Sequence, residues 1–215
     1  MKKLIIFDLD GTLLNTIADL GTSCNYALEQ MGFATHPISS YNYMVGNGIR
    51  KLMERAQPDA DPKTIDELLV HFRHHYDEHC TDSTTPYPGI PELLAELTER
   101  GIAVAVSTNK YESAARRIIA HFFPDIPFVA VMGQVEDRPT KPDPSIDFAI
   151  LQKHPTPKAQ TMHVGDSAVD IETARRACVD SVGVTWGFRP VSELRKAFAD
   201  HLVSSPSEIL NLAVR

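Results

Sequence analysis

The segment that most constrains the fold lies near the N-terminus, where a short apolar run ends abruptly in charged residues. Residues 4–7 are all apolar, and Asp-Leu-Asp-Gly-Thr follows at residues 8–12. An apolar run of this length that stops at turn-forming residues predicts a buried β-strand. Asp8 and Asp10 are two residues apart, so an extended backbone would point both carboxylates the same way. Like charges repel at that spacing unless a cation lies between them. The segment therefore predicts a metal-assisted site at the end of a central strand.

Composition narrows the class of protein. The 215 residues are 43% hydrophobic and 23% charged, which is typical of a chain with a sizeable core, and the formal net charge is −7. A negative balance disfavours nucleic acid or an anionic membrane as partner, but not a small phosphorylated metabolite. The three cysteines are far apart and form no Cys-x-x-Cys motif, which predicts a reduced, cytoplasmic setting.

From residue 86 onward, predicted strands alternate with predicted helices. The strands are expected over residues 102–106, 128–132, 161–164 and 181–184 and near 202–203, and the helices over 89–100, up to about 121, and over 144–153, 170–177 and 206–214. This alternation predicts an α/β fold with a doubly wound parallel sheet. Ligands of such sheets bind at the carboxyl ends of the strands, where Asp8, Thr108 and Asp166 are expected.

Residues 16–85 have a different pattern. An amphipathic helix is expected over 16–31, with Thr16 as its N-terminal cap, and further helices over 39–44, 48–57 and 62–81. No strand is expected between residues 33 and 85. This block is predicted to be a helical insertion in the α/β fold.

Three residues far along the chain extend the predicted site. Lys141 lies in a proline-rich loop, and its ammonium group suits a phosphate or a carboxylate. Asp166 follows a predicted strand, and a helix that begins at Ser167 would turn Asp170 back toward the same edge. Carboxylate ligands favour a hard cation such as Mg²⁺. This set predicts phosphoryl transfer, in which a carboxylate attacks phosphorus while cations offset the charge.

These motifs resemble those of a known superfamily. DLDGT at residues 8–12, the strand-end Thr108, Lys141 in KPDP and GDSAVD at 165–170 match, in order, the four motifs of the haloacid dehalogenase superfamily. The sequence is most similar to its phosphatases with a helical cap, the phosphoglycolate phosphatase group. The resemblance implies a Rossmann-like core formed by residues 1–15 and 83–215, and an inserted α-helical cap formed by residues 16–82.

The resemblance also implies roles for the motif residues. Asp8 is expected to be the nucleophile and a Mg²⁺ ligand. Asp10 is expected to be the general acid and base, with its backbone carbonyl on Mg²⁺. Lys141 is expected to steady Asp8 and the phosphoryl group. Asp166 is expected to bind Mg²⁺, and Asp170 to bind it directly or to support a ligand.

Substrate-binding residues follow from the same resemblance. Thr108 and Asn109 are expected to contact the phosphate. Gly48, in a Gly-Asn-Gly loop of the cap, and the nearby Arg50 are expected to contact the substrate. The Trp-Gly-Phe-Arg segment at residues 186–189 resembles a stretch common in the phosphoglycolate phosphatase group.

The implied function is a Mg²⁺-dependent phosphatase that hydrolyses a small phosphomonoester of the 2-phosphoglycolate type through an aspartyl phosphate. Dehalogenases and phosphonate hydrolases of the superfamily lack the second aspartate, present here as Asp10, and are disfavoured. A β-phosphoglucomutase-like mutase, a pyrophosphatase or nucleotidase, and a catalytically silent phosphate-binding regulatory protein stay open as alternatives.

Three further expectations concern the cap and the assembly. His71, His75 and His79 share one helical stripe, which is expected to be a polar face of the cap in preference to a metal site. Hinges for cap closure are expected near Asn15 and over residues 83–87. The protein is expected to be a monomer or a homodimer.

Overall fold

The central strand of the fold is the apolar segment near the N-terminus. The computed structural model describes residues 1–215, and in it all four side chains of β1 (Leu4–Phe7) are fully buried. They are buried because β1 lies inside a six-stranded sheet of order β5-β4-β1-β6-β7-β8, in which every pair is parallel. The other strands are β4 (Ala103–Tyr111), β5 (Ala130–Gln134), β6 (Thr161–Gly165), β7 (Asp180–Val184) and β8 (His201–Val203). The predicted α/β fold is confirmed.

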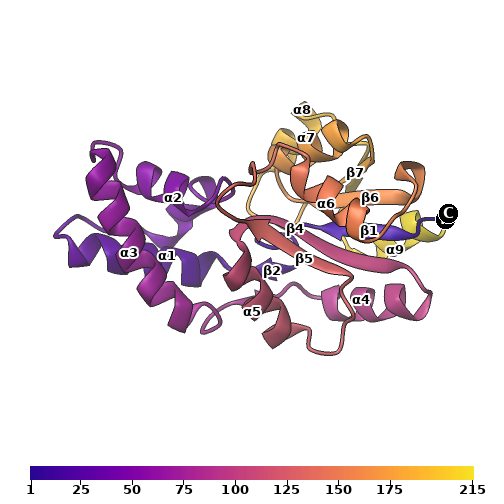
Figure 1. Ribbon diagram of the computed structural model, residues 1–215, viewed down its shortest axis with the longest axis horizontal. Helices are drawn as coiled ribbons and strands as arrows, with labels where there is room; N and C mark the ends of the chain where they lie inside the picture. Colours follow the sequence, from indigo (N-terminus) through magenta and orange to yellow (C-terminus); the bar gives the residue numbers. More distant parts are fainter.

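Helices cover both faces of this sheet (Figure 1). They are α4 (Ile90–Glu99), α5 (Glu112–Phe122), α6 (Ser145–Lys153), α7 (Ala168–Ala177), α8 (Val191–Lys196) and α9 (Pro206–Val214), with a 3₁₀ turn η2 at Lys158–Gln160. α6 and α7 lie on one side of the sheet, and α4 and α5 lie on the other. The sequence prediction missed α8, which has only six residues and too few turns to show a helical period.

A second group of helices stands to one side of the sheet (Figure 1). It consists of α1 (Ile17–Gln30), η1 (Ile38–Tyr43), α2 (Ile49–Ala56) and α3 (Pro62–His79), and we call it the helical block. The helix expected over residues 39–44 is a 3₁₀ helix. α3 begins where the side chain of Asp61 accepts a hydrogen bond from the Thr64 amide, with Pro62 in the first turn. Thr16 does not cap α1 as expected, because its hydroxyl donates to the Asp10 carboxylate at 2.7 Å.

Two short segments connect the helical block to the sheet. β2 (Leu14–Asn15) pairs antiparallel with β3 (Thr85–Pro86), so the two expected hinge regions lie side by side. The prediction of no strand between residues 33 and 85 was wrong at Thr85, the first residue of β3, because two-residue strands leave no periodic signal. The buried carboxylate of Asp19 accepts hydrogen bonds from the amides of Ser83 and Thr84 and from the Thr84 hydroxyl, at 2.7–3.1 Å. Asp19 therefore fastens the two connections together.

The hydrophobic core is continuous between the sheet and the helical block. A single cluster of 41 buried residues includes Phe7 on β1, Leu28 on α1 and Phe72 on α3. Burial of this apolar surface stabilises the contact between the two parts. None of the helices is both long and apolar enough to cross a bilayer.

Candidate active site

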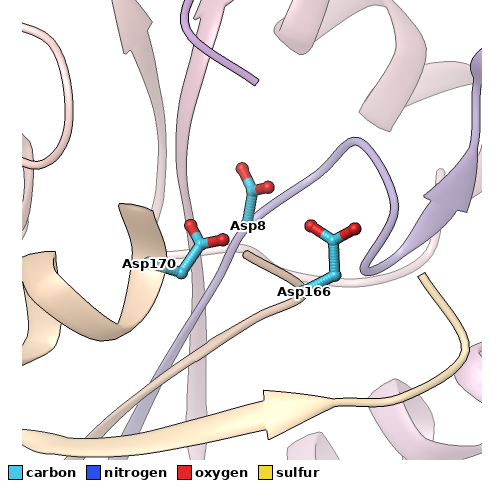
Figure 2. Close-up of side chains that lie close together, drawn as sticks. All are labelled: Asp8, Asp166 and Asp170. Carbon is cyan, nitrogen blue, oxygen red and sulfur yellow. The ribbon is translucent and has the colours of Figure 1, made fainter. Parts of the chain in front are cut away.

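Three carboxylates converge at the carboxyl edge of the sheet (Figure 2). Asp8 directly follows β1, Asp166 directly follows the neighbouring strand β6, and Asp170 lies in the first turn of α7. Each offers an oxygen that lies within 4.8 Å of the others, and all three residues are buried. Two adjacent parallel strands end together here, which explains why residues more than 150 positions apart in the sequence meet.

A capping box fixes the position of Asp170. The amide and the hydroxyl of Ser167 both donate to Asp170 Oδ2, at 3.1 and 2.6 Å, while the Ser167 side chain caps the start of α7. This arrangement turns the Asp170 carboxylate toward the strand ends, as the sequence predicted for a helix beginning at Ser167. Its other oxygen, Oδ1, accepts from Lys141.

Lys141 is the cation at the centre of this cluster. Its Nζ donates to Asp8 Oδ1 at 2.9 Å, to Asp170 Oδ1 at 2.7 Å and to the Ser107 carbonyl at 2.7 Å, which satisfies all three of its donors. Burial disfavours the charged form, but Asp170 and Asp8 outweigh burial and raise the pKa of Lys141. Burial also acts on Asp170, and Lys141 and His163 outweigh it and lower the pKa of that carboxyl. Lys141 and Asp170 therefore form a buried ion pair at neutral pH.

The pKa values of Asp8 and Asp166 are raised, in contrast to that of Asp170. Burial, followed by repulsion from Asp170 and Asp10, raises the pKa of Asp8 to about 6 despite Lys141. Burial and repulsion from Asp170 and Asp8 raise the pKa of Asp166 well above its usual value. Negative charge is thus in excess at this point, and a cation would relieve it.

The free oxygens of the cluster fit a divalent ion. Asp8 Oδ1 is engaged by Lys141, and Asp166 Oδ2 accepts from the Phe188 amide at 2.6 Å. The remaining oxygen of each carboxylate takes no hydrogen bond from the protein, whereas both oxygens of Asp170 are engaged. An all-oxygen donor set suits Mg²⁺. Asp8 and Asp166 can therefore hold such an ion, with Asp170 orienting Lys141 beside them.

Asp10 lines the same pocket as Asp8, and its negative charge contributes to the raised pKa of Asp8. The Asp10 carboxylate accepts from Lys110 Nζ at 2.8 and 3.0 Å and from Thr16 Oγ1 at 2.7 Å. The sequence reasoning gave Lys110 no role, although it follows Thr108 and Asn109 directly. It was missed because β4 was expected to end near residue 106 but continues to Tyr111.

Thr108 and Asn109, the two residues expected to contact the phosphate, differ in whether their side chains have a free donor. Thr108 is buried and lines the pocket, and its hydroxyl oxygen accepts from the Lys110 amide at 3.2 Å, which leaves the hydroxyl hydrogen free. The Asn109 side chain, by contrast, is fully occupied by backbone groups. Its amide nitrogen donates to the carbonyls of Gly46 and Lys141, and its oxygen accepts from the Lys141 amide. Asn109 thus holds two loops in place and has no side-chain donor left for a phosphate.

A buried histidine supports the cluster from behind. His163, on β6, lies 2.7 Å from Asp147 Oδ2 on α6 and 3.6 Å from Asp170 Oδ1. Burial opposes its charged form, but the Asp147 carboxylate outweighs burial and raises the pKa of His163 to about 9. The imidazolium that results at neutral pH adds a second positive charge beside Asp170. No sequence motif singled out this pair, because its members lie on separate elements.

A pocket opens above these residues, between the sheet and the helical block. Asp8, Asp10, Lys141 and Asp166 line it from the sheet, and Val45, Gly46, Gly48, Ile49, Leu52 and Tyr76 line it from the helical block. Gly48 packs so closely that a Cβ on it would lie 2.9 Å from Gln134 Oε1 on β5, and its φ of +82° also favours glycine. Gly48 therefore lines the pocket where the helical block approaches β5 most closely, at a position that favours glycine.

Arg50 and the histidine stripe of the helical block both lie outside the pocket lining. Arg50 does not line the pocket, because its guanidinium pairs with Asp66 on the surface of the helical block. His75 bonds to the Ser23 hydroxyl at 2.9 Å and His79 to Asp82 at 2.8 Å. The residues arranged to hold a metal ion are Asp8, Asp166 and Asp170, and the role of the histidine stripe as a polar helix face stays a prediction.

Comparison with known proteins agrees with this geometry. Residues 5–184 match the family of haloacid dehalogenase-like hydrolases. A phosphoglycolate phosphatase of Agrobacterium fabrum is 36% identical over 198 residues, which cover 89% of this chain and 84% of the relative. A phosphoglycolate phosphatase of Aquifex aeolicus is 29% identical, and the match covers 98% of this chain and 96% of the relative. The crystal structure of a predicted phosphoglycolate phosphatase from Haemophilus somnus is 28% identical, with a TM-score of 0.91 over 98% of this chain and 97% of that one. The chain belongs to the haloacid dehalogenase-like hydrolases.

Proposed function

We propose that this hydrolase is a Mg²⁺-dependent phosphatase that acts on a small phosphomonoester of the 2-phosphoglycolate type through an aspartyl phosphate. The observation that carries the proposal is the buried Asp8 carboxylate, which has one oxygen held by Lys141 and the other free at the pocket, beside Asp166. The relatives named phosphoglycolate phosphatase support the substrate class.

Asp8 is the proposed nucleophile. Lys141 holds Asp8 Oδ1 at 2.9 Å, so the second oxygen is fixed in direction and can attack phosphorus in line with the leaving oxygen. Mg²⁺ held by Asp8, Asp166 and the Asp10 backbone carbonyl would offset charge on the phosphoryl oxygens. The Thr108 hydroxyl supplies a hydrogen-bond donor for one of those oxygens.

Asp10 is the proposed general acid and base. Its carboxylate lines the same pocket and is held by Lys110 and Thr16, so its position is fixed relative to Asp8. As an acid it would protonate the leaving oxygen, and as a base it would activate the water that hydrolyses the aspartyl phosphate.

We also propose that residues 16–82 act as a cap over a catalytic core formed by residues 1–15 and 83–215. The paired connections β2 and β3, fastened by Asp19, are the place where such a cap would pivot. Closure would exclude water from the pocket while Asp8 reacts, which protects the intermediate.

The test is a substrate screen with purified protein. Phosphate release from p-nitrophenyl phosphate and from common phosphorylated metabolites is measured with Mg²⁺ and with excess chelator. We expect Mg²⁺-dependent release, with the highest kcat/KM for 2-phosphoglycolate or a similarly short ester. The absence of release from every compound would contradict the proposal, and isomerisation of a sugar phosphate without net release would assign a mutase instead.

Asp10→Asn is expected to lower kcat by about 10²–10⁴-fold, because the amide cannot protonate the leaving oxygen or activate water. The loss should be smaller for p-nitrophenyl phosphate, whose leaving group is a weak base, than for an alkyl phosphate. Steady-state kinetics on both substrates measure the difference. A kcat close to that of the wild type on the alkyl phosphate would show that another group transfers the proton.

A further inference from the structure

One buried cation in the pocket holds Asp10 and has a further N–H donor left. Three cationic side chains line the pocket, namely Lys110, Lys141 and Arg189. All donors of Lys141 are engaged by the cluster behind Asp8. Arg189 is half-buried at the rim, where it donates to the Val45 carbonyl at 2.9 Å. Lys110 is only 4% exposed and pairs with Asp10.

A buried tyrosine of the helical block packs against this lysine. Tyr76, on α3, is fully buried and lines the pocket, and its hydroxyl has no hydrogen-bond partner in the protein. Lys110 Nζ lies 4.9 Å from the centroid of the Tyr76 ring, so the cation rests over the ring face. A buried hydroxyl without a partner is costly, and such groups are retained where a ligand completes the hydrogen bond.

We infer that Lys110 and Tyr76 bind a carboxylate on the leaving group of the substrate. The inference rests on the proposed phosphatase function, because it requires Asp10 to lie at the ester oxygen. In 2-phosphoglycolate a single methylene carbon separates the ester oxygen from the carboxylate. Asp10 protonates the ester oxygen in the proposed reaction. In so short a leaving group the carboxylate would therefore lie close to Asp10 and would reach the residue beside it. That residue is Lys110, whose Nζ lies 2.8 and 3.0 Å from the Asp10 oxygens.

The chemistry of the two groups fits this ligand. An ammonium group has three N–H donors, so Lys110 can keep its pair with Asp10 and also donate to a second carboxylate. The Tyr76 hydroxyl, which has no partner in the protein, would add a neutral donor from α3. Leu20, Ile49 and Leu52 add a buried apolar wall to the pocket. The substrate class is therefore a phosphomonoester whose carboxylate lies one carbon beyond the ester oxygen, and longer polar alcohols would meet the apolar wall.

The two groups also belong to different parts of the fold. Lys110 is on β4 of the sheet, whereas Tyr76 is on α3 of the helical block. A carboxylate between them would bridge the core and the cap. The leaving group would thereby stabilise the closed arrangement in which Asp10 acts on it.

The experiment compares two substrates that differ only in this group. 2-Phosphoglycolate carries the carboxylate, and ethyl phosphate has a methyl group in its place. The readout is the ratio of their kcat/KM values, which cancels effects shared by both substrates, including a disturbed Asp10. We expect the ratio to fall about tenfold or more in Lys110→Gln, to be retained largely in Lys110→Arg, and to fall about threefold to tenfold in Tyr76→Phe. Lys51→Gln, which removes an exposed lysine of α2 outside the pocket, is the matched control and should leave the ratio unchanged.

The outcomes separate this inference from the proposed function. An unchanged ratio in Tyr76→Phe and Lys110→Gln would overturn the inference, as would a ratio that falls only in Arg189→Gln. A wild-type enzyme that hydrolyses both esters equally well would also overturn it while leaving the phosphatase assignment intact. If no phosphomonoester is hydrolysed with Mg²⁺, both fail together. Should Lys110→Gln not fold, Tyr76→Phe alone decides the question, because it deletes one oxygen and keeps the ring.

Discussion

Asp8→Asn is expected to lower kcat for any phosphomonoester by about 10⁴-fold or more, because an amide cannot form the covalent phosphoryl bond. The amide keeps the shape of the side chain and can still accept the hydrogen bond from Lys141. Binding of substrate and the fold itself should therefore survive. Single-turnover and steady-state kinetics measure the loss, and Asp8→Ala, which cannot revert by deamidation, should show the same loss.

The same substitution should not weaken the fold. Burial above all raises the pKa of Asp8 from 3.8 to about 6, so the unfolded chain releases this proton at lower pH than the folded chain. The stability cost grows between these two pKa values and is fully present at pH 7. A neutral amide removes that cost. In chelator at pH 7 we expect Asp8→Asn to unfold at the same or a higher denaturant concentration than the wild type. Asp66→Asn, on the surface, is the matched control. Appreciable turnover by Asp8→Asn would exclude Asp8 as the nucleophile.

Lys141→Gln is expected to have the largest combined effect on stability and activity. The substitution leaves Asp170 without its buried partner and Asp8 without the group that orients it. Removal of one member of a buried ion pair costs about 3–5 kcal/mol, and we expect a loss of this size in the free energy of unfolding. We also expect kcat to fall by about 10³-fold, because Asp8 loses both its orientation and a charge near the phosphoryl group.

A double substitution separates the two effects. In Lys141→Gln/Asp170→Asn the unpaired charge on Asp170 is absent, so much of the lost stability should return while activity does not. Mg²⁺ should stabilise Lys141→Gln by mass action, since it binds the folded cluster. Urea unfolding with and without Mg²⁺ measures both effects, and Lys63→Gln, which removes a highly exposed lysine, is the control. A Lys141→Gln variant as stable as the wild type would contradict the ion-pair interpretation.

The sequence predicted the parts of the site that lie at strand ends. Asp8 and Asp166 each follow an apolar run directly, and the ends of neighbouring parallel strands must meet, so their convergence follows from the pattern alone. Asp170 was predictable for a different reason, since a serine three residues before an acid is a recognisable helix start. Lys141 was predicted at the site from its proline-rich loop and its charge, and the family resemblance supplied its contact with Asp8.

The remaining parts depend on tertiary contacts that leave no local signal. Asn109 was expected to contact phosphate, and its side chain is instead saturated by the backbone of Gly46 and Lys141. Arg50 was expected at the substrate, and a helix turn directs it to Asp66 on the surface. The pairing of Lys110 with Asp10 depends on a strand that continues five residues beyond its apolar run. In each case the partner of the side chain lies on another segment of the chain, which the local sequence does not identify.

The hydrogen bonds of the Asp19 carboxylate limit where the cap can be exchanged for that of another protein. Asp19 lies in the first turn of α1, yet it accepts hydrogen bonds from the backbone of Ser83 and Thr84, where the chain leaves the helical block. A chimera that grafts a foreign cap onto this scaffold must therefore take Asp19 and residues 83–84 from the same parent protein. Junctions within β2 and β3 meet this condition, whereas junctions directly before Asp19 and directly before Ser83 would remove these hydrogen bonds.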